Sequence, residues 1–286
     1  CIHNTGAEVI RHIGSNEAVY DIDRIRQALG DKQLTAVAYS YGTQIAALYA
    51  ERFPYNVRSI VLDGVVDIDD PEDNFTWQLK QAQSYQETFD RFASWCARTK
   101  SCPLSSDRDK AITQFHDLLL KLHHRPLIDS KGENISSDEL ISLTTDLLLW
   151  RSSWPTLATA IRQFSQGIVS APIASEESSD ALGVILCVDQ GDDKLTPEER
   201  KYRKDALENA FPAINFDNGR SDSPDFCELW PIHSDLNKTR LKNTVLPSGL
   251  LFVAHKYDPT TPWINARKMA DKFSSPLLTI NGDGHT

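Results

Sequence analysis

A serine, an aspartate and a histidine in this sequence have the types and order that nucleophilic catalysis requires. Ser40 lies at the centre of residues 38–42 (AYSYG), between an apolar run and a helical pattern. A turn of this kind exposes the serine hydroxyl at the end of a strand, and the amide of the next residue, Tyr41, is a natural oxyanion donor. Serine is a weak nucleophile and needs a histidine base that an acid holds in one tautomer. Asp258 and His285 follow in that order, so we expect Ser40, Asp258 and His285 to form a catalytic triad.

The segments around Ser40 have the pattern of a parallel sheet. Residues 17–29 place apolar side chains on one helical face, and Gly30 suits the end of that helix. The apolar runs 34–38 and 59–62 favour strands that are buried on both faces. Residues 43–52 have helical spacing between them. This strand–helix–strand order predicts a βαβ unit.

The same pattern returns near the end of the chain. Residues 250–254 and 276–280 are predicted strands, and residues 263–273 a predicted helix. Asp258 follows the first of these strands and His285 the second. Because the carboxyl ends of parallel strands meet at one edge of a sheet, this topology favours a common site with Ser40.

Asp63 and His255 are alternatives for the acid and the base. Asp63 also follows a strand, but Asp63-Gly64 equally indicates a turn in which the carboxylate satisfies backbone amides. His255 is close to Asp258 in sequence, and at the strand end it would compete for the same small space. We therefore favour Asp258 and His285.

A helical block separates the two parts of the predicted sheet. It shows no strand alternation, and capping boxes are predicted at Ser136 with Glu139 and at Thr196 with Glu199. We expect residues 1–70 and 246–286 to form the sheet domain and residues 71–245 to form a helical cap or lid. The expected helices of the block are 74–97, 107–123, 137–150, 155–166 and one that starts at 197.

Composition narrows the class of protein. The formal charge of −10 argues against a non-specific hold on nucleic acid or an anionic membrane. No apolar run approaches the roughly 20 residues of a membrane-spanning helix. The five cysteines lack metal-ligand spacing, and we expect disulfides rather than free thiols, which favours a periplasmic or secreted protein. They comprise a close pair (Cys96, Cys102), a distant pair (Cys187, Cys227) and an odd Cys1.

The sequence resembles the tripeptidyl-aminopeptidase-like branch of the α/β-hydrolases, which is related to proline iminopeptidases. The likeness covers nearly the whole chain, and four of the cysteines look like landmarks of the lid of that branch: Cys96, Cys102, Cys187 and Cys227. The matching motifs are residues 40–43 (SYGT), 61–65 (VLDGV), 258–262 (DPTTP) and 282–285 (GDGH). The resemblance implies a serine exopeptidase that acts without a metal or cofactor on short peptides with a free N-terminus.

Two departures from that pattern affect the expected site. Ala38 stands where the elbow usually has glycine. Only residues 1–33 precede the elbow strand, and they contain no Gly-rich loop that would give the second oxyanion donor. Losing one donor costs on the order of 3–4 kcal/mol of transition-state stabilisation. We therefore expect an α/β-hydrolase fold that lacks its N-terminal strands, completed by an N-terminal companion segment or chain with which Cys1 pairs.

An exopeptidase needs an anionic group for the substrate ammonium. Asp189, which follows Cys187 in the family-like motif, is the first candidate, and Glu228 beside Cys227 is another. Asp192 and Asp193 are further candidates. The alternative functions are a carboxylesterase with the same triad and a non-catalytic binding protein of the same fold.

Overall fold

The computed structural model describes most of the chain, in nine ranges of residues. These ranges are 2–69, 74–99, 102–130, 132, 134–169, 180–190, 194–216, 224–232 and 245–286. Cys1, Asp192 and Asp193 lie outside them, so their predicted roles stay predictions. Among the described residues, no helix is long and apolar enough to cross a membrane.

The chain divides into two compact units. The first comprises residues 1–78, 178–199 and 223–286, and the second residues 79–177 and 200–222. The first contains the sheet, and the second consists mainly of helices. The domain boundaries predicted from the sequence, at residues 71 and 245, differ from this division. The main reason is that residues 178–199 and 223–245 group with the sheet.

The sheet of the first unit has four parallel strands in the order β1-β2-β5-β6. Ala38 of β1 pairs with Leu62 of β2, and Phe252 of β5 pairs with Leu277 of β6. This is the α/β class of fold that the sequence predicts. The strands are β1 (Leu34–Tyr39), β2 (Val57–Asp63), β5 (Leu250–Tyr257) and β6 (Leu277–Asp283).

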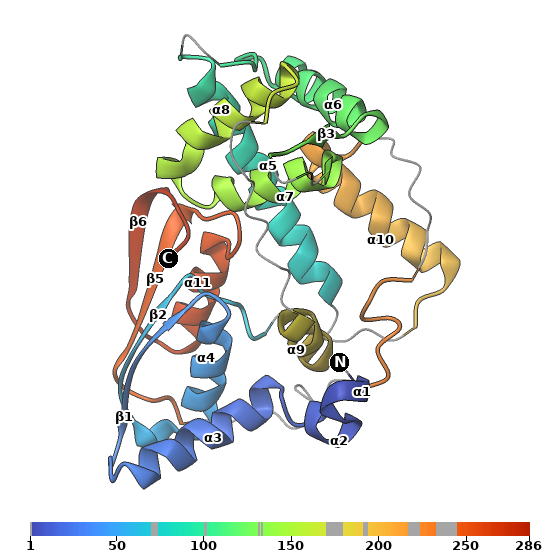
Figure 1. The fold of residues 1–286 in the computed structure, drawn as a ribbon. Coiled ribbons are helices and arrows are strands. Elements are labelled where there is room, and N and C mark those ends of the chain that lie inside the picture. The colour runs from blue at the N-terminus through green and yellow to red at the C-terminus, as the bar shows by residue number, and fades with distance from the viewer. Residues whose placement is uncertain are drawn as a thin grey trace. The chain divides into compact units, whose positions relative to one another are not determined.

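Three helices of the first unit, α3, α4 and α11, were predicted from the sequence as residues 17–29, 43–52 and 263–273, whereas α1, α2 and α9 were not predicted. The helix before β1 ends as expected, with Gly30 at φ 76°. Figure 1 shows α4 and α11 on the same side of the sheet. The helices are α1 (Ile2–Thr5), α2 (Ala7–Ile10), α3 (Ser15–Ala28), α4 (Gly42–Arg52), η1 (Pro54–Asn56), α9 (Asp180–Gln190) and α11 (Trp263–Lys272).

Two buried clusters stabilise this unit. The larger lies between the sheet and its helices and includes Ile60, Leu62, Phe252 and Met269. The smaller joins α2, α9 and residues 224–232, and the disulfide between Cys187 and Cys227 belongs to it.

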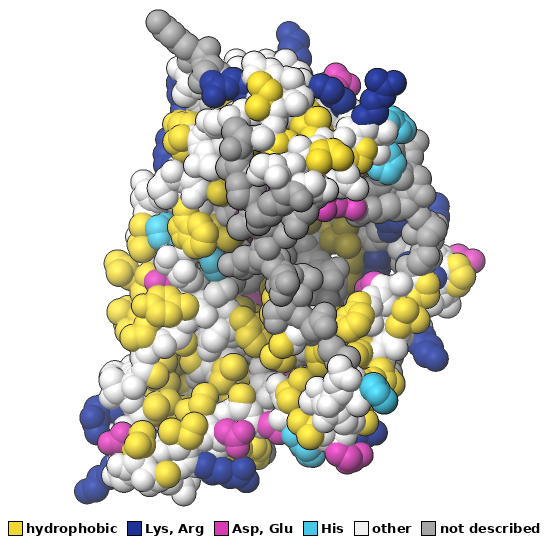
Figure 2. Space-filling model, viewed as in Figure 1, with side chains coloured by type: hydrophobic (Ala, Val, Ile, Leu, Met, Phe, Trp, Pro, Cys, Tyr) yellow, Lys and Arg dark blue, Asp and Glu magenta, His cyan; other side chains and the backbone are white. Residues whose placement is uncertain are grey.

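The prediction that β1 is buried on both faces is wrong. Its side chains alternate, and Val37 and Tyr39 are 56% and 59% exposed, whereas Ala38 is buried. On β6, Leu278 and Ile280 are also exposed. Among the described residues both strands are edges of the sheet, and α4 and α11 pack on the opposite face from these exposed side chains. Figure 2 shows hydrophobic side chains gathered along the side where Figure 1 places β1, β5 and β6.

The second unit packs its helices around a core of its own. Phe89, Phe115, Leu119, Leu140 and Trp154 are fully buried in it. Its elements are α5 (Asn74–Cys96), which begins in the first unit, α6 (Arg108–His124), β3 (Leu127–Ile128), β4 (Asn134–Ile135), α7 (Ser137–Leu148), η2 (Arg151–Ser153), α8 (Trp154–Ser165), α10 (Pro197–Ala210), which also crosses the division, and η3 (Pro212–Ile214).

The expectation that the helical block contains no strand is also wrong. β3 and β4 form a two-residue antiparallel pair between α6 and α7. The alternation is too short for a periodicity argument to detect. The capping box of Ser136 and Glu139 is present at the start of α7.

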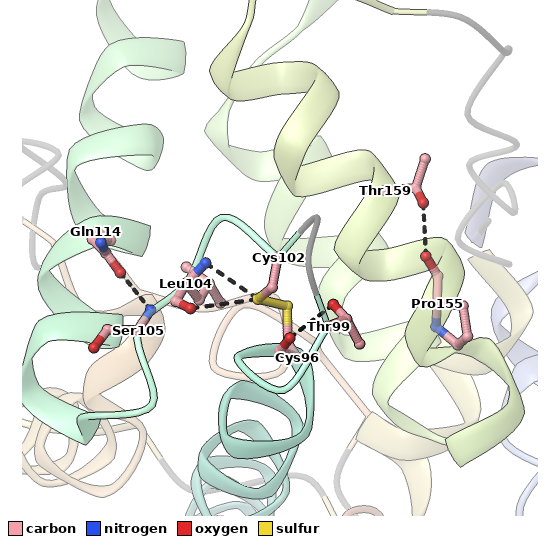
Figure 3. The surroundings of a disulfide bond; sticks show 8 residues. All are labelled: Cys96, Thr99, Cys102, Leu104, Ser105, Gln114, Pro155 and Thr159. Carbon is pink, nitrogen blue, oxygen red and sulfur yellow. Dashed lines mark hydrogen bonds between the residues drawn. A yellow bond between two sulfur atoms is a disulfide. The ribbon is translucent and has the colours of Figure 1, made fainter.

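A disulfide between Cys96 and Cys102 closes the turn after α5 (Figure 3). The Thr99 hydroxyl donates to the carbonyl of Cys96 at 2.8 Å, and the Leu104 amide lies 3.3 Å from the Cys102 sulfur. The disulfide therefore joins the end of α5 to the segment that leads into α6.

Candidate active site

Ser40 lies at a strained turn between β1 and α4. Its φ of 50° is in the left-handed region, which residues with a Cβ adopt at a cost. Hydrogen bonds on both sides hold this conformation. The Ser40 amide donates to the Asp63 carbonyl at 2.9 Å, and the Thr43 amide and hydroxyl donate to the Ser40 carbonyl at 2.9 and 2.6 Å. The turn therefore places the Ser40 hydroxyl just after β1, within hydrogen-bond distance of His285.

The structure brings the three predicted triad side chains together. His285 Nε2 lies 2.8 Å from Ser40 Oγ, and His285 Nδ1 lies 2.8 Å from Asp258 Oδ2. Ser40 follows β1, Asp258 follows β5 and His285 follows β6, so all three lie at the carboxyl edge of the sheet. The Asp258 side chain is fully buried, and that of His285 is 9% exposed. This geometry suits proton transfer from serine to histidine.

Asp258 is held in place by donors in the turn that follows it. Its Oδ1 accepts from the amides of Thr260 at 2.8 Å and Thr261 at 2.9 Å. Its Oδ2 accepts from the Thr261 hydroxyl at 2.8 Å, and the same hydroxyl lies 3.3 Å from His285 Nδ1. These contacts fix the carboxylate that faces the imidazole. Thr261 is a site residue that the sequence analysis did not identify, although it lies inside the motif DPTTP.

Asp63 and His255, the alternatives for acid and base, do not join this hydrogen-bonded chain. Asp63 Oδ1 and His255 Nδ1 are buried, and neither has a hydrogen-bond partner among the described residues. Burial raises the pKa of Asp63, and the charge of Asp258 raises it further, against an opposing effect of His255 and His285. The geometry therefore favours Asp258 as the acid.

Tyr41 and Gly42 begin α4. Tyr41 occupies the N-cap, where the first amides of a helix have no acceptor within the helix and the dipole favours an anion. Gly42, two residues after Ser40, has open space around it among the described residues. A Cβ at Gly42 would meet no atom within 4 Å in the described structure.

Asp189 and Glu228, the candidates for the substrate ammonium, are both buried and both accept hydrogen bonds. Asp189 accepts from the Ser15 amide at 2.8 Å and from Gln44 at 3.1 Å, and also from the hydroxyls of Ser15 and Tyr41. Glu228 and Asp225 exchange hydrogen bonds, each accepting from the other's amide, at 3.2 and 2.8 Å. Among the described residues, no group of His, Cys, Asp or Glu side chains is arranged to hold a metal ion.

Comparison with known proteins identifies the fold family. A family model described as "alpha/beta hydrolase fold" matches residues 13–286. The putative hydrolase YuaR of Escherichia coli is 80% identical over 294 residues, and the serine protease Hip1 of Mycobacterium tuberculosis is 31% identical over 320 residues. A carboxylesterase B of M. tuberculosis and a tripeptidyl aminopeptidase of Streptomyces lividans are each 26% identical.

These relatives are longer than this chain. The matches cover 99–100% of this chain but 59% of YuaR, 58% of Hip1, 57% of the carboxylesterase and 54% of the aminopeptidase. The chain therefore spans little more than half the length of these relatives.

Proposed function

Because the chain belongs to the α/β-hydrolase family, we propose that it is a serine exopeptidase that releases residues or short peptides from the free N-terminus of peptide substrates. The observation that carries the serine hydrolase part of this proposal is the hydrogen-bonded chain from Ser40 through His285 to Asp258, with 2.8 Å at each link. Neither a metal nor a cofactor is needed for the chemistry that these groups perform.

Acylation begins when His285 Nε2 takes the proton of Ser40 Oγ as that oxygen attacks the substrate carbonyl. The buried Asp258 carboxylate holds the imidazole by Nδ1–H and stabilises its charged form. The amide of Tyr41 donates to the oxyanion, at the positive end of α4. His285 then gives its proton to the leaving amine, and the C–N bond breaks.

Deacylation repeats these steps with water. His285 takes a proton from water as the water oxygen attacks the acyl ester of Ser40. Collapse of the second tetrahedral intermediate breaks the ester bond, releases the new carboxyl group and returns the proton to Ser40.

The choice of peptides over esters rests on the sequence motifs and on the named relatives, among them a serine protease and a tripeptidyl aminopeptidase. A carboxylesterase with the same triad is the second candidate, and the relative named carboxylesterase B favours it. The triad geometry is common to both.

Paired substrates separate the two functions. An exopeptidase hydrolyses aminoacyl and tripeptidyl anilides with a free amine and leaves their N-acetylated forms intact. An esterase prefers p-nitrophenyl acetate and is insensitive to acetylation of an anilide. Ser40→Ala is the control that must abolish each activity. Equal rates on free and blocked anilides would contradict the exopeptidase proposal.

We further propose that a companion segment or chain completes the sheet unit and supplies a second oxyanion donor. The exposed apolar face of β1 and β6 supports this, because Val37, Tyr39, Leu278 and Ile280 are between 38% and 59% exposed. A periplasmic or secreted location is in keeping with the two disulfides.

A further inference from the structure

Asp189 connects three helices of the first unit. It lies near the end of α9, and its Oδ1 accepts from the amide of Ser15, the first residue of α3, at 2.8 Å. Its Oδ2 accepts from the Tyr41 hydroxyl and, at 3.1 Å, from Gln44 Nε2. Tyr41 and Gln44 are the N-cap and the third residue of α4. One carboxylate therefore ties the start of α3 and the start of α4 to α9.

This arrangement is closely packed. Asp189 is 4% exposed, and Ser15 and Gln44 are 1% and 3% exposed. Gly14, the N-cap of α3, offers no side-chain cap of its own. A Cβ at Gly14 would come within 2.7 Å of Asp189 Oδ1, so glycine is needed for the carboxylate to reach the helix end. Asp189 thus caps α3 from another element.

The role of Tyr41 in this group is that of a donor. Burial raises the pKa of its hydroxyl, and the adjacent Asp189 charge raises it further, so the hydroxyl stays protonated and donates to the carboxylate. Ser15 Oγ lies 3.1 Å from the same hydroxyl, and Gln44 Nε2 lies 3.4 Å from it. The Tyr41 ring is therefore fixed from several directions.

The backbone of Tyr41 connects the hydrogen bonds around Asp189 to the proposed reaction. Tyr41 directly follows Ser40, and its amide is the oxyanion donor of the proposed mechanism. An oxyanion donor works only when it is held in advance toward the developing charge. A displacement of about 1 Å is enough to lose about 100-fold in rate.

We infer that Asp189 is a positioning residue that holds Tyr41 and Gln44, and through them the oxyanion donor beside Ser40, rather than the group that binds the substrate ammonium. This inference rests on the proposed serine hydrolase function. The disulfide from Cys187, two residues before Asp189, to Cys227 fixes the helix that carries the carboxylate.

The test compares Asp189→Asn and Tyr41→Phe on two substrates, a free-amine aminoacyl anilide and p-nitrophenyl acetate, which has no ammonium group. Both variants should lower kcat about 10- to 100-fold on both substrates and change KM less than about threefold. The double variant should be no slower than the slower single variant, because the hydrogen bond that Tyr41→Phe removes is one of those that Asp189→Asn weakens. Asp23→Asn is the matched control, since Asp23 is equally buried and accepts from Tyr49 at 3.0 Å in the same unit.

The outcomes separate the possible roles of Asp189. A rise in KM confined to the free-amine substrate would overturn the inference and identify Asp189 as the ammonium site. Unchanged kinetics in both variants would overturn it as well. Loss of folding in Asp189→Asn is checked by circular dichroism, and Tyr41→Phe, which removes one hydroxyl, then carries the test.

Hydrogen exchange gives a readout that does not depend on turnover. The amides of residues 41–45 should exchange faster in Asp189→Asn and Tyr41→Phe than in the wild type or in Asp23→Asn. Unchanged exchange would contradict the positioning role even if the wild type hydrolysed neither substrate. Absence of hydrolysis by the wild type would by itself count against the proposed function.

Discussion

The Thr261 side chain touches both Asp258 and His285. We predict that Thr261→Val lowers kcat about 10-fold, because the buried carboxylate loses a hydroxyl donor worth about 1.5 kcal/mol while the amide donor remains. Steady-state kinetics on either substrate class measures the effect. Thr260→Val is the control, since Thr260 contacts Asp258 through its amide. Equal loss in both variants would contradict a specific role for the Thr261 hydroxyl.

Gly64 lies beside the triad with φ at 68°. A Cβ there would come within 2.5 Å of Thr286 Cγ2 and 3.1 Å of His285 Cε1. We predict that Gly64→Ala displaces His285 and lowers kcat at least about 10-fold, besides costing about 1 kcal/mol of stability.

Gly30→Ala provides the comparison for that variant. Gly30 has a similar φ of 76°, and a Cβ there would meet no atom within 4 Å in the described structure. It should therefore lose stability and keep kcat. If Gly64→Ala and Gly30→Ala behave alike, the contact with His285 has no catalytic consequence.

The meeting of Ser40, Asp258 and His285 could be predicted from the sequence, because their order and their positions after predicted strands restrict where their side chains lie. The sequence did not identify Thr261 or the hydrogen bonds of Asp189. Those contacts depend on side-chain directions in turns and on the approach of α9 to α4. Residues 189 and 41 are far apart in sequence, and no periodicity encodes their contact.

At the scale of elements, Asp23 joins α3, α4 and η1. Its carboxylate accepts from Arg26 and Gln27 of its own helix, from Tyr49 of α4 and from Asn56 of η1. Burial raises the pKa of Asp23, but these four hydrogen bonds outweigh that effect and lower it from 3.8 to about 2.

The lowered pKa of Asp23 sets the pH range in which its carboxylate adds to the free energy of unfolding. Ionised Asp23 stabilises the fold above about pH 4, and the contribution is lost as the pH falls toward 2. We predict that Asp23→Asn lowers the free energy of unfolding by about 2 kcal/mol at pH 7 and by much less at pH 2. Urea unfolding at both pH values measures the difference. A loss that does not vary with pH would contradict this account of the carboxylate.

Helices with regular apolar spacing and strands with apolar runs were predicted at the right places. Short strands, and helices that are apolar on several sides, were not. The helices α3 to α8 and the four parallel strands agree with their helical spacing and apolar runs. α9 was not assigned, because it is apolar on several sides and has no clear period. The sequence predicts that β1 is buried on both faces, yet Val37 and Tyr39 are exposed. An apolar run indicates that a strand is suited to pack against apolar side chains. It does not reveal whether this chain itself supplies them on both faces of the strand.

At the scale of the molecule, the apolar face of the sheet is a candidate site of self-association when the chain is prepared alone. We predict that replacing Val37 and Tyr39 of β1 with lysine lowers self-association, measured by analytical ultracentrifugation. Tyr55→Lys is the control, because Tyr55 is 75% exposed in η1 and lies outside this face. Equal self-association of the wild type, the double variant and Tyr55→Lys would show that this face does not mediate self-association.

Labelling with a fluorophosphonate tests the central claim most directly, because the probe reacts with a serine only when a base activates it. The wild-type protein should form a covalent adduct that mass spectrometry maps to Ser40. Ser40→Ala should form none, and His285→Ala should react at least about 1,000-fold more slowly. Labelling of Ser40 at the same rate in His285→Ala, or no labelling of Ser40 in the wild type, would contradict the catalytic role of the triad.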